Sequence, residues 1–166
     1  MSHVRRVQVG KFTPEQFKLH TQRLSEKPMD WGTFRKQGEY KKEYDRPHVR
    51  MVGGSITQVH DEEGCIPAEG FTLSLMMMPP GSVAPSHSHE VEEVFYCLQG
   101  QLVGFWEDDD GKVMETTLYP NDLLHSPAGI MHGLRNDTHA DALVQVIIGK
   151  GRPLKPNYVD PKLADL

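Results

Sequence analysis

The central part of the chain alternates short apolar runs with clusters of turn-forming residues. From about residue 45 onward, runs rich in β-branched, aromatic and other apolar residues occupy 48–59, 71–78, 91–98, 101–107, 113–118, 122–125 and 142–148. Glycine, proline and aspartate separate these runs, and Asp110-Gly111 has the residues of a tight hairpin turn. Many short strands between such turns predict an all-β sandwich or barrel.

A different pattern precedes these runs. Residues 12–27 predict one helix, in which Thr13 is the N-cap and Gln16 completes a capping box. Phe12 and Phe17 have the spacing of a hydrophobic staple. We expect this helix to pack as a cover on the main body rather than to take part in chemistry.

We expect one β domain flanked by two extensions. A chain of 166 residues has the length of a single domain. The predicted parts are an N-terminal extension with one helix over 1–44, a barrel over 45–150 and a tail over 151–166. Prolines recur in that tail, which favours an extended path across the surface.

Composition and charge exclude several classes of protein. The net charge is −5, from 18 basic and 23 acidic residues, which disfavours a nucleic-acid-binding protein. No apolar run approaches the roughly 20 residues that span a bilayer, and no apolar stretch follows the basic residues near the N-terminus, as a secretory signal would require. Cys65 and Cys97 are too few for a disulfide framework, so the cytoplasm is the expected compartment. The count of nine histidines is the unusual feature.

Three of the polar residues between 81 and 100 have the spacing of metal ligands. The segment reads GSVAPSHSHEVEEVFYCLQG, and on a strand His87 and His89 would point to the same face. Glu93 follows four residues later, and imidazoles with a carboxylate are typical ligands of divalent metals. Two histidines at this spacing are by themselves more often ordinary surface or core residues. A fourth ligand, His132, is available if the fold brings its segment, SPAGIMHGLRN, close to the first.

The whole of this segment resembles the first motif of the cupin superfamily. Gly81, His87, His89, Glu93 and Gly100 all stand at that motif's spacing.

A second segment resembles the second cupin motif. Pro127, Gly129, His132 and Asn136 have its spacing. The motif usually begins with Gly-Asp, where this chain has Asn121-Asp122. The departure is mild, because asparagine tolerates the left-handed backbone region better than most residues.

The resemblance covers about residues 50–150 and implies a double-stranded β-helix, the jelly-roll cupin barrel, with its site in one mouth. It also implies that His87, His89, Glu93 and His132 bind one divalent metal ion. Such a set leaves positive charge on the ion, and an octahedral ion would keep two positions for water, substrate or dioxygen. Iron(II) is the first expectation, although manganese, nickel and zinc also suit these ligands.

The leading hypothesis for function is a metal-dependent oxidoreductase of dioxygenase type that acts on a small oxygen-chelating organic molecule. An alternative is a redox-neutral isomerase or lyase that works through an enolate, with His125 as the catalytic base. A third is a non-catalytic cupin that binds a small molecule. We expect a small-molecule substrate and a homodimer that covers edge strands, with neither nucleic acid nor membrane as a partner.

Several further residues are predicted to be structural. Phe95 and Cys97 share the parity of Glu93 and should face inward beside it, and Trp106 is expected to be a packing or dimer residue. The acidic run 107–110 is expected at a solvated hairpin tip.

Basic residues and the remaining histidines are predicted at the surface. The basic residues of segment 35–50, which include Arg46, alternate with acids as on a solvated face, although they could also attract an anionic substrate to the barrel mouth. Five histidines have no partner spacing and are expected to be exposed: His3, His20, His48, His60 and His139.

Overall fold

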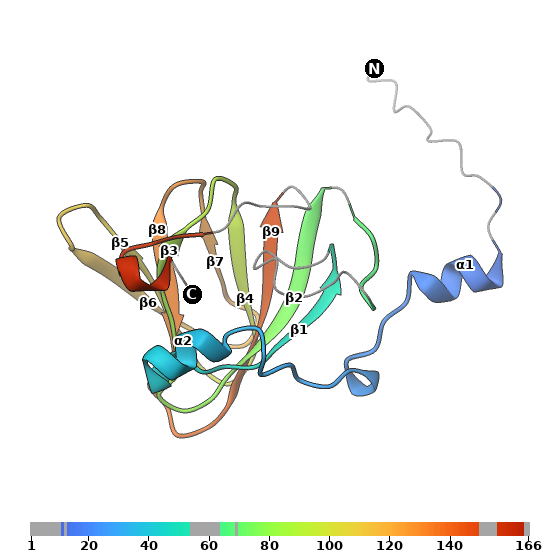
Figure 1. Cartoon of the computed structure of the whole chain (residues 1–166), viewed down its shortest axis with the longest axis horizontal. Helices are drawn as coiled ribbons and strands as arrows, with labels where there is room; N and C mark the ends of the chain where they lie inside the picture. The colour runs from blue at the N-terminus through green and yellow to red at the C-terminus, as the bar shows by residue number, and fades with distance from the viewer. Residues whose placement is uncertain (1–10, 12, 54–63, 69, 150–155, 165–166) are drawn as a thin grey trace, which may run out of the picture.

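Ten strands form the body of the structure, a computed structural model that describes residues 11, 13–53, 64–68, 70–149 and 156–164. The strands are β1 (His48–Val52), β2 (Phe71–Met78), β3 (Val83–Ser88), β4 (Glu93–Gln99), β5 (Leu102–Glu107), β6 (Val113–Leu118), β7 (Leu123–Ser126), β8 (Met131–Arg135), β9 (Ala142–Gly149) and β10 (Asn157–Tyr158). In the described chain they make two five-stranded sheets with the orders β1-β2-β9-β4-β7 and β10-β3-β8-β5-β6 (Figure 1). Every pairing between these strands is antiparallel.

The two sheets share one hydrophobic core, as the alternating pattern predicts. Along β9 every second residue is buried, so one face of the strand is apolar and turned inward. Phe95 and Val144 come to the core from one sheet, and Leu102 and Leu134 come from the other. Cys97 is a free, buried thiol, as expected. The predicted all-β jelly roll is confirmed.

Apolar periodicity found most of the strands but not those that carry the candidate histidines. The predicted runs 71–78 and 113–118 coincide with β2 and β6. No run was predicted over β3 or β8. In β3 the sequence VAPSHS has little apolar alternation and contains Pro85, so its strand conformation depends on pairing with β8.

The N-terminal helix is shorter and more exposed than expected. Helix α1 spans Pro14–Leu19, and a 3-10 turn, η1, follows at Leu24–Glu26. The capping box of Thr13 and Gln16 is confirmed. The hydroxyl of Thr21 donates to the carbonyl of Phe17 at 3.2 Å, a contact that competes with continuing the helix.

The expectation that this helix packs as a cover on the main body is wrong. No residue of α1 is buried, and the side chain of Phe17 is 67% exposed. The proposed staple partner, Phe12, lies outside the described residues.

A second helix, absent from the prediction, covers part of the barrel. Helix α2 spans Arg35–Tyr40 and η2 spans Lys42–Tyr44. The solvated face predicted for segment 35–50 is wrong for Arg46, which is 3% exposed. Figure 1 shows α2 beside the C-terminal segment, which forms β10 and the 3-10 turn η3 (Pro161–Leu163).

Contacts between the two extensions join residues far apart in the sequence. Gln37 Nε2 donates to the Tyr158 hydroxyl at 2.9 Å, and the Tyr40 hydroxyl donates to Asp160 at 3.0 Å. The C-terminal tail is therefore extended where it pairs with β3, and it also holds α2 in place.

The motif position that departs from glycine adopts the backbone that glycine would favour. Asn121 has a φ of 80°, and it is the one non-glycine residue with positive φ in the described ranges. Its backbone N–H donates to the Cys97 carbonyl at 2.9 Å. Within the same ranges no helix has both the length and the apolar character needed to cross a membrane.

Candidate metal centre

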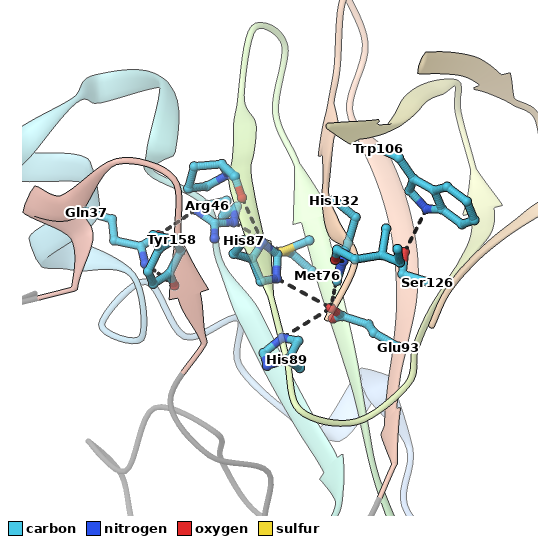
Figure 2. A network of polar contacts seen from close by, with 12 residues as sticks. Gln37, Arg46, Met76, His87, His89, Glu93, Trp106, Ser126, His132 and Tyr158 are labelled. Atoms are coloured by element: carbon cyan, nitrogen blue, oxygen red, sulfur yellow. Dashed lines mark hydrogen bonds and ion pairs between the residues drawn. The ribbon is translucent and has the colours of Figure 1, made fainter. Parts of the chain in front are cut away.

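Four buried side chains converge at one end of the barrel (Figure 2). They are His87, His89, Glu93 and His132. Each offers one possible ligand atom, a ring nitrogen or a carboxylate oxygen, and these four atoms all lie within 4.8 Å of one another. Their exposed fractions are 8%, 2%, 2% and 1%, respectively. His87 and His132 come from one sheet, Glu93 from the other, and His89 from the connection between β3 and β4. The fold therefore brings together the two segments that the sequence could only suggest were close.

A β-bulge sets the position of His87. In the pairing of β3 with β8, Ala84 is opposite Leu134 and His87 is opposite His132. Three residue steps on β3 thus match two steps on β8, so one extra residue is inserted between them. The bulge places the two imidazoles opposite each other across the ladder, with ring centroids 4.7 Å apart and ring planes tilted by 49°.

Backbone groups contact all three histidines of the cluster. The Gly129 N–H donates to the carbonyl of His89 at 2.8 Å, which ties the second motif to the first. Nδ1 of His87 lies 2.7 Å from the Pro85 carbonyl, and Nδ1 of His132 lies 2.7 Å from the Ile130 carbonyl. A carbonyl only accepts hydrogen bonds, so Nδ1 carries the proton in both rings and Nε2 presents a lone pair.

All three Nε2 atoms face the same carboxylate oxygen. Glu93 Oε2 lies 2.5 Å from His132 Nε2, 3.2 Å from His89 Nε2 and 3.4 Å from His87 Nε2. Burial raises the pKa of Glu93, and a hydrogen bond or positive charge on the side of the imidazoles, from a shared proton or a bound cation, holds that pKa well below its usual range. Burial also lowers the pKa of His87, which keeps that ring neutral. A carboxylate and neutral imidazoles are the forms that bind a metal ion.

The cluster contains hydrogen-bond acceptors that the described residues do not satisfy. Lone pairs of His132 and Glu93 that meet at 2.5 Å repel each other unless a proton or a cation lies between them. Both ring nitrogens of His89 are buried without a hydrogen-bond partner in the described residues, and such burial is unfavourable. Three imidazoles and one carboxylate fit a divalent cation of borderline softness.

The structure does not bring His125 to this cluster. In the register of β4 with β7, Ser126 is opposite Glu93, whereas His125 is opposite Val94. Ser126 therefore faces inward and His125 faces outward, with a side chain that is 46% exposed and 3.6 Å from Glu92. His125 has no part in the proposals below.

Trp106 is a packing residue at the same end of the barrel. It lies opposite His132 in the pairing of β5 with β8. Its indole N–H donates to the hydroxyl of Ser126 at 3.1 Å, which links the two sheets beside the cluster.

A cavity adjoins the cluster on the side of α2 and the C-terminal tail. Its volume is about 50 Å³ when measured to the centres of water molecules, and one water needs roughly 10–15 Å³ of such space. It has room for several waters or one small organic molecule. The wall consists of Thr33, Phe34, Arg46, His48, Thr72, Ser74, Met76, Ala84, His87, Glu93, Phe95, Val146, Ile148, Pro156 and Tyr158.

The sequence reasoning did not assign three polar residues of this wall to the site. Arg46 directly precedes β1 and Tyr158 belongs to the C-terminal tail, and no spacing signal connects them with the motifs. His48 was expected at the surface, but its Nδ1 is buried, and burial lowers its pKa to about 3. His20 and His139 are exposed, as expected, whereas His3 and His60 lie outside the described residues.

A family model described as "Cupin domain" matches residues 74–148. This part of the chain is a cupin domain, as its two motifs indicated. Its sequence is similar to quercetin 2,3-dioxygenase of Bacillus subtilis (strain 168), with 39% identity over 85 residues, which is 50% of this chain and 24% of that protein. It is also similar to auxin-binding protein 1 of Arabidopsis thaliana, with 35% identity over 114 residues, which is 64% of this chain and 53% of that protein.

A solved structure supports the same fold. The DMSP lyase DddQ from Ruegeria pomeroyi DSS-3 superposes with a TM-score of 0.57 over 70% of this chain and 53% of that one. At 20% identity this similarity shows the fold alone. The chain spans between a quarter and about half of the length of these curated relatives.

Proposed function

We propose that His87, His89, Glu93 and His132 bind one divalent metal ion and that the adjoining cavity holds a small organic substrate. The observation that supports this most strongly is the unsatisfied set of acceptors, above all the buried His89 ring without a hydrogen-bond partner in the described residues. The carbonyl partners of His87 and His132 would hold their rings ready to bind the ion.

The proposed reaction is an oxidation of dioxygenase type on a substrate that chelates through two oxygen atoms. The similarity to a quercetin 2,3-dioxygenase supports this choice, although the match covers only 24% of that protein. When bound, an ion such as iron(II) would supply Lewis acidity and one-electron chemistry. The chain itself would orient the substrate against Phe95 and Met76 and limit the entry of water through a narrow, mostly apolar cavity.

Binding without catalysis is the second candidate function. The similarity to auxin-binding protein 1, which covers 64% of this chain, supports a small-molecule-binding role for the same cavity. His125, the base expected for the isomerase or lyase alternative, faces outward, so the geometry of the cluster does not favour that alternative. The homodimer stays a prediction.

Metal content tests the proposal directly. After exposure to iron(II), manganese(II), nickel(II) and zinc(II) in separate experiments, we expect elemental analysis to find about one ion per chain with at least one of these metals. His132→Ala should lose that ion, because it removes one of the four ligands. His139→Ala, which changes an exposed histidine, is the matched control and should keep it.

The outcome also separates the two candidate functions. Iron or manganese together with oxygen uptake on addition of a chelating substrate would support the oxidoreductase. Zinc without oxygen uptake would favour binding alone. Failure of the wild-type chain to retain any of the four metals would overturn the metal site.

A further inference from the structure

Arg46 is a buried cation that is held in place by uncharged partners. Its Nη1 donates to the Tyr44 carbonyl at 2.6 Å and to Gln37 Oε1 at 3.1 Å, and its Nε donates to the Met76 sulfur at 3.2 Å. The guanidinium carbon lies 3.8 Å from the centroid of the Phe34 ring. These contacts fix the orientation of the side chain, but none of them supplies a negative charge.

In the part of the chain that the structure describes, no carboxylate forms an ion pair with Arg46, although Asp45 and Glu93 act on it from a greater distance. The neighbouring acid, Asp45, pairs with Lys42 at 2.7 Å. Burial lowers the pKa of Arg46 to about 10, so the guanidinium is still charged at neutral pH. A buried charge without a counter-ion is strongly destabilising, and an anion bound beside it would remove that cost.

The guanidinium has an unused donor at the wall of the cavity. Among the described residues, no hydrogen bond uses Nη2 of Arg46. Arg46 lines the same cavity as His87 and Glu93. In Figure 2, His87 lies in the middle, with Arg46 and Tyr158 to its left and Glu93 to its right. An anion bound to Nη2 would therefore lie in the cavity beside the candidate metal centre.

Tyr158 lines the same cavity as Arg46 and offers a second donor. Its hydroxyl oxygen accepts from Gln37 Nε2 at 2.9 Å, which leaves the hydroxyl proton available to a ligand. Its ring centroid lies 5.6 Å from that of His87. A carboxylate has two acceptor oxygens, one for Arg46 Nη2 and one for the tyrosine hydroxyl, and its negative charge matches the guanidinium.

We propose that the cavity binds a small organic carboxylate, whose charged group contacts Arg46 Nη2 and the Tyr158 hydroxyl. The apolar part of the ligand would pack on apolar side chains of the same wall, such as Phe95 and Val146. This inference names the substrate class of the proposed function and rests on it for the role of the cavity. The carboxylate contact itself does not require a metal ion.

Matched pairs of acid and amide test the proposal. The probes are benzoate against benzamide and isobutyrate against isobutyramide, which differ in charge but little in shape. Binding would be measured on the full chain by NMR chemical-shift titration, both with and without bound metal. We expect each acid to bind at least about tenfold more tightly than its amide, since hydrogen bonds to charged groups are the stronger class.

Arg46→Gln should abolish that preference, because it removes the charge and keeps a polar side chain of moderate size. Arg35→Gln is the matched control, since Arg35 is exposed on α2 and carries the same charge. Its preference should equal that of the wild-type chain. If Arg46→Gln loses its dispersed NMR spectrum, Arg46→Lys takes its place, and its preference must fall because one ammonium group cannot keep the contacts with Tyr44, Gln37 and Met76 and also reach the ligand.

Three results would overturn the inference. The first is equal binding of acid and amide by the wild-type chain, and the second is no binding of either acid at millimolar concentration. The third is an acid preference that persists in the folded Arg46 variants but disappears on removal of the metal, which would place the carboxylate on the ion. A failed metal site is recognised separately, because metal-free chain would then still show the preference due to Arg46.

Discussion

Single residues set the electrostatic character of the site. The Nδ1 contacts of His87 and His132 with backbone carbonyls direct both Nε2 atoms to Glu93. The carbonyls lie within two residues of each imidazole, so a short segment of chain determines the tautomer locally. The same segments would then present neutral imidazole to a cation without any proton transfer from elsewhere.

His48 lies outside the metal centre with its Nδ1 buried, and it predicts how stability depends on pH. Burial is the main cause that lowers its pKa to about 3, with smaller contributions from Arg50 and Arg46. The unfolded chain binds a proton at His48 near pH 6.5, whereas the folded chain does so only near pH 3. This residue therefore contributes stability that is fully present above pH 6.5 and is lost as the pH falls from 6.5 towards 3.

We expect His48→Gln to reduce this acid sensitivity. Between pH 7.5 and pH 5 the wild-type chain should lose up to about 2 kcal/mol of unfolding free energy through His48, and the variant should lack that part. Urea unfolding of the metal-free chain at both pH values measures the difference. His139→Gln, which changes an exposed imidazole, should behave like the wild-type chain, and identical pH slopes for His48→Gln and the wild-type chain would refute the assignment.

At the scale of elements, the last residue of the second motif, Asn136, connects the ends of strands through buried hydrogen bonds. Asn136 is 0% exposed and its Nδ2 donates to the Met78 carbonyl at 2.7 Å and the Ala140 carbonyl at 2.8 Å. Its Oδ1 accepts from the backbone and the hydroxyl of Thr138. This motif residue thus holds the ends of β2 and β8 and the turn into β9, and its contribution is structural.

Asn136→Ala should destabilise the fold by about 2–4 kcal/mol, because it removes the hydrogen bonds of a fully buried side chain to the Met78 and Ala140 carbonyls and to Thr138. Denaturant unfolding at constant pH measures the loss. Asn157→Ala, at an exposed position of β10, is the control and should change stability by less than about 0.5 kcal/mol. A change of similar size in both variants would contradict the proposed structural role of the Asn136 hydrogen bonds.

At the scale of the whole molecule, the candidate metal centre joins the two sheets. Glu93 belongs to one sheet, while His87 and His132 belong to the other. A bound ion would therefore cross-link the sheets at one mouth of the barrel and would stabilise only the folded chain. The extensions close the neighbouring cavity from outside, through α2 and the tail.

Removal of the ion should therefore lower global stability. At a free metal concentration a hundredfold above Kd, the unfolding free energy should exceed that of the chelator-treated chain by about 2.7 kcal/mol. Thermal or urea unfolding with and without chelator measures this gap. The gap should vanish in His132→Ala and persist in His139→Ala, so an equal chelator effect in both variants would show that the ion binds elsewhere.

The sequence by itself determined the class of fold and the four candidate ligands. Turns with a left-handed backbone need residues such as Gly100 and Asn121, and inward strand positions need apolar side chains. Both requirements can be recognised from residues that are close together in the sequence. The two motifs are of this local kind. Their spacing was enough to nominate His87, His89, Glu93 and His132.

Only the tertiary structure decided what surrounds those ligands. Whether His125 faces in or out depends on the register of β7 against β4, which no spacing within one segment specifies. Arg46 and Tyr158 lie outside the motifs, in segments whose charge and composition are those of ordinary surface. They form the cavity wall because α2 and the C-terminal tail pack against the barrel, and contacts between residues more than 100 positions apart leave no periodicity to read.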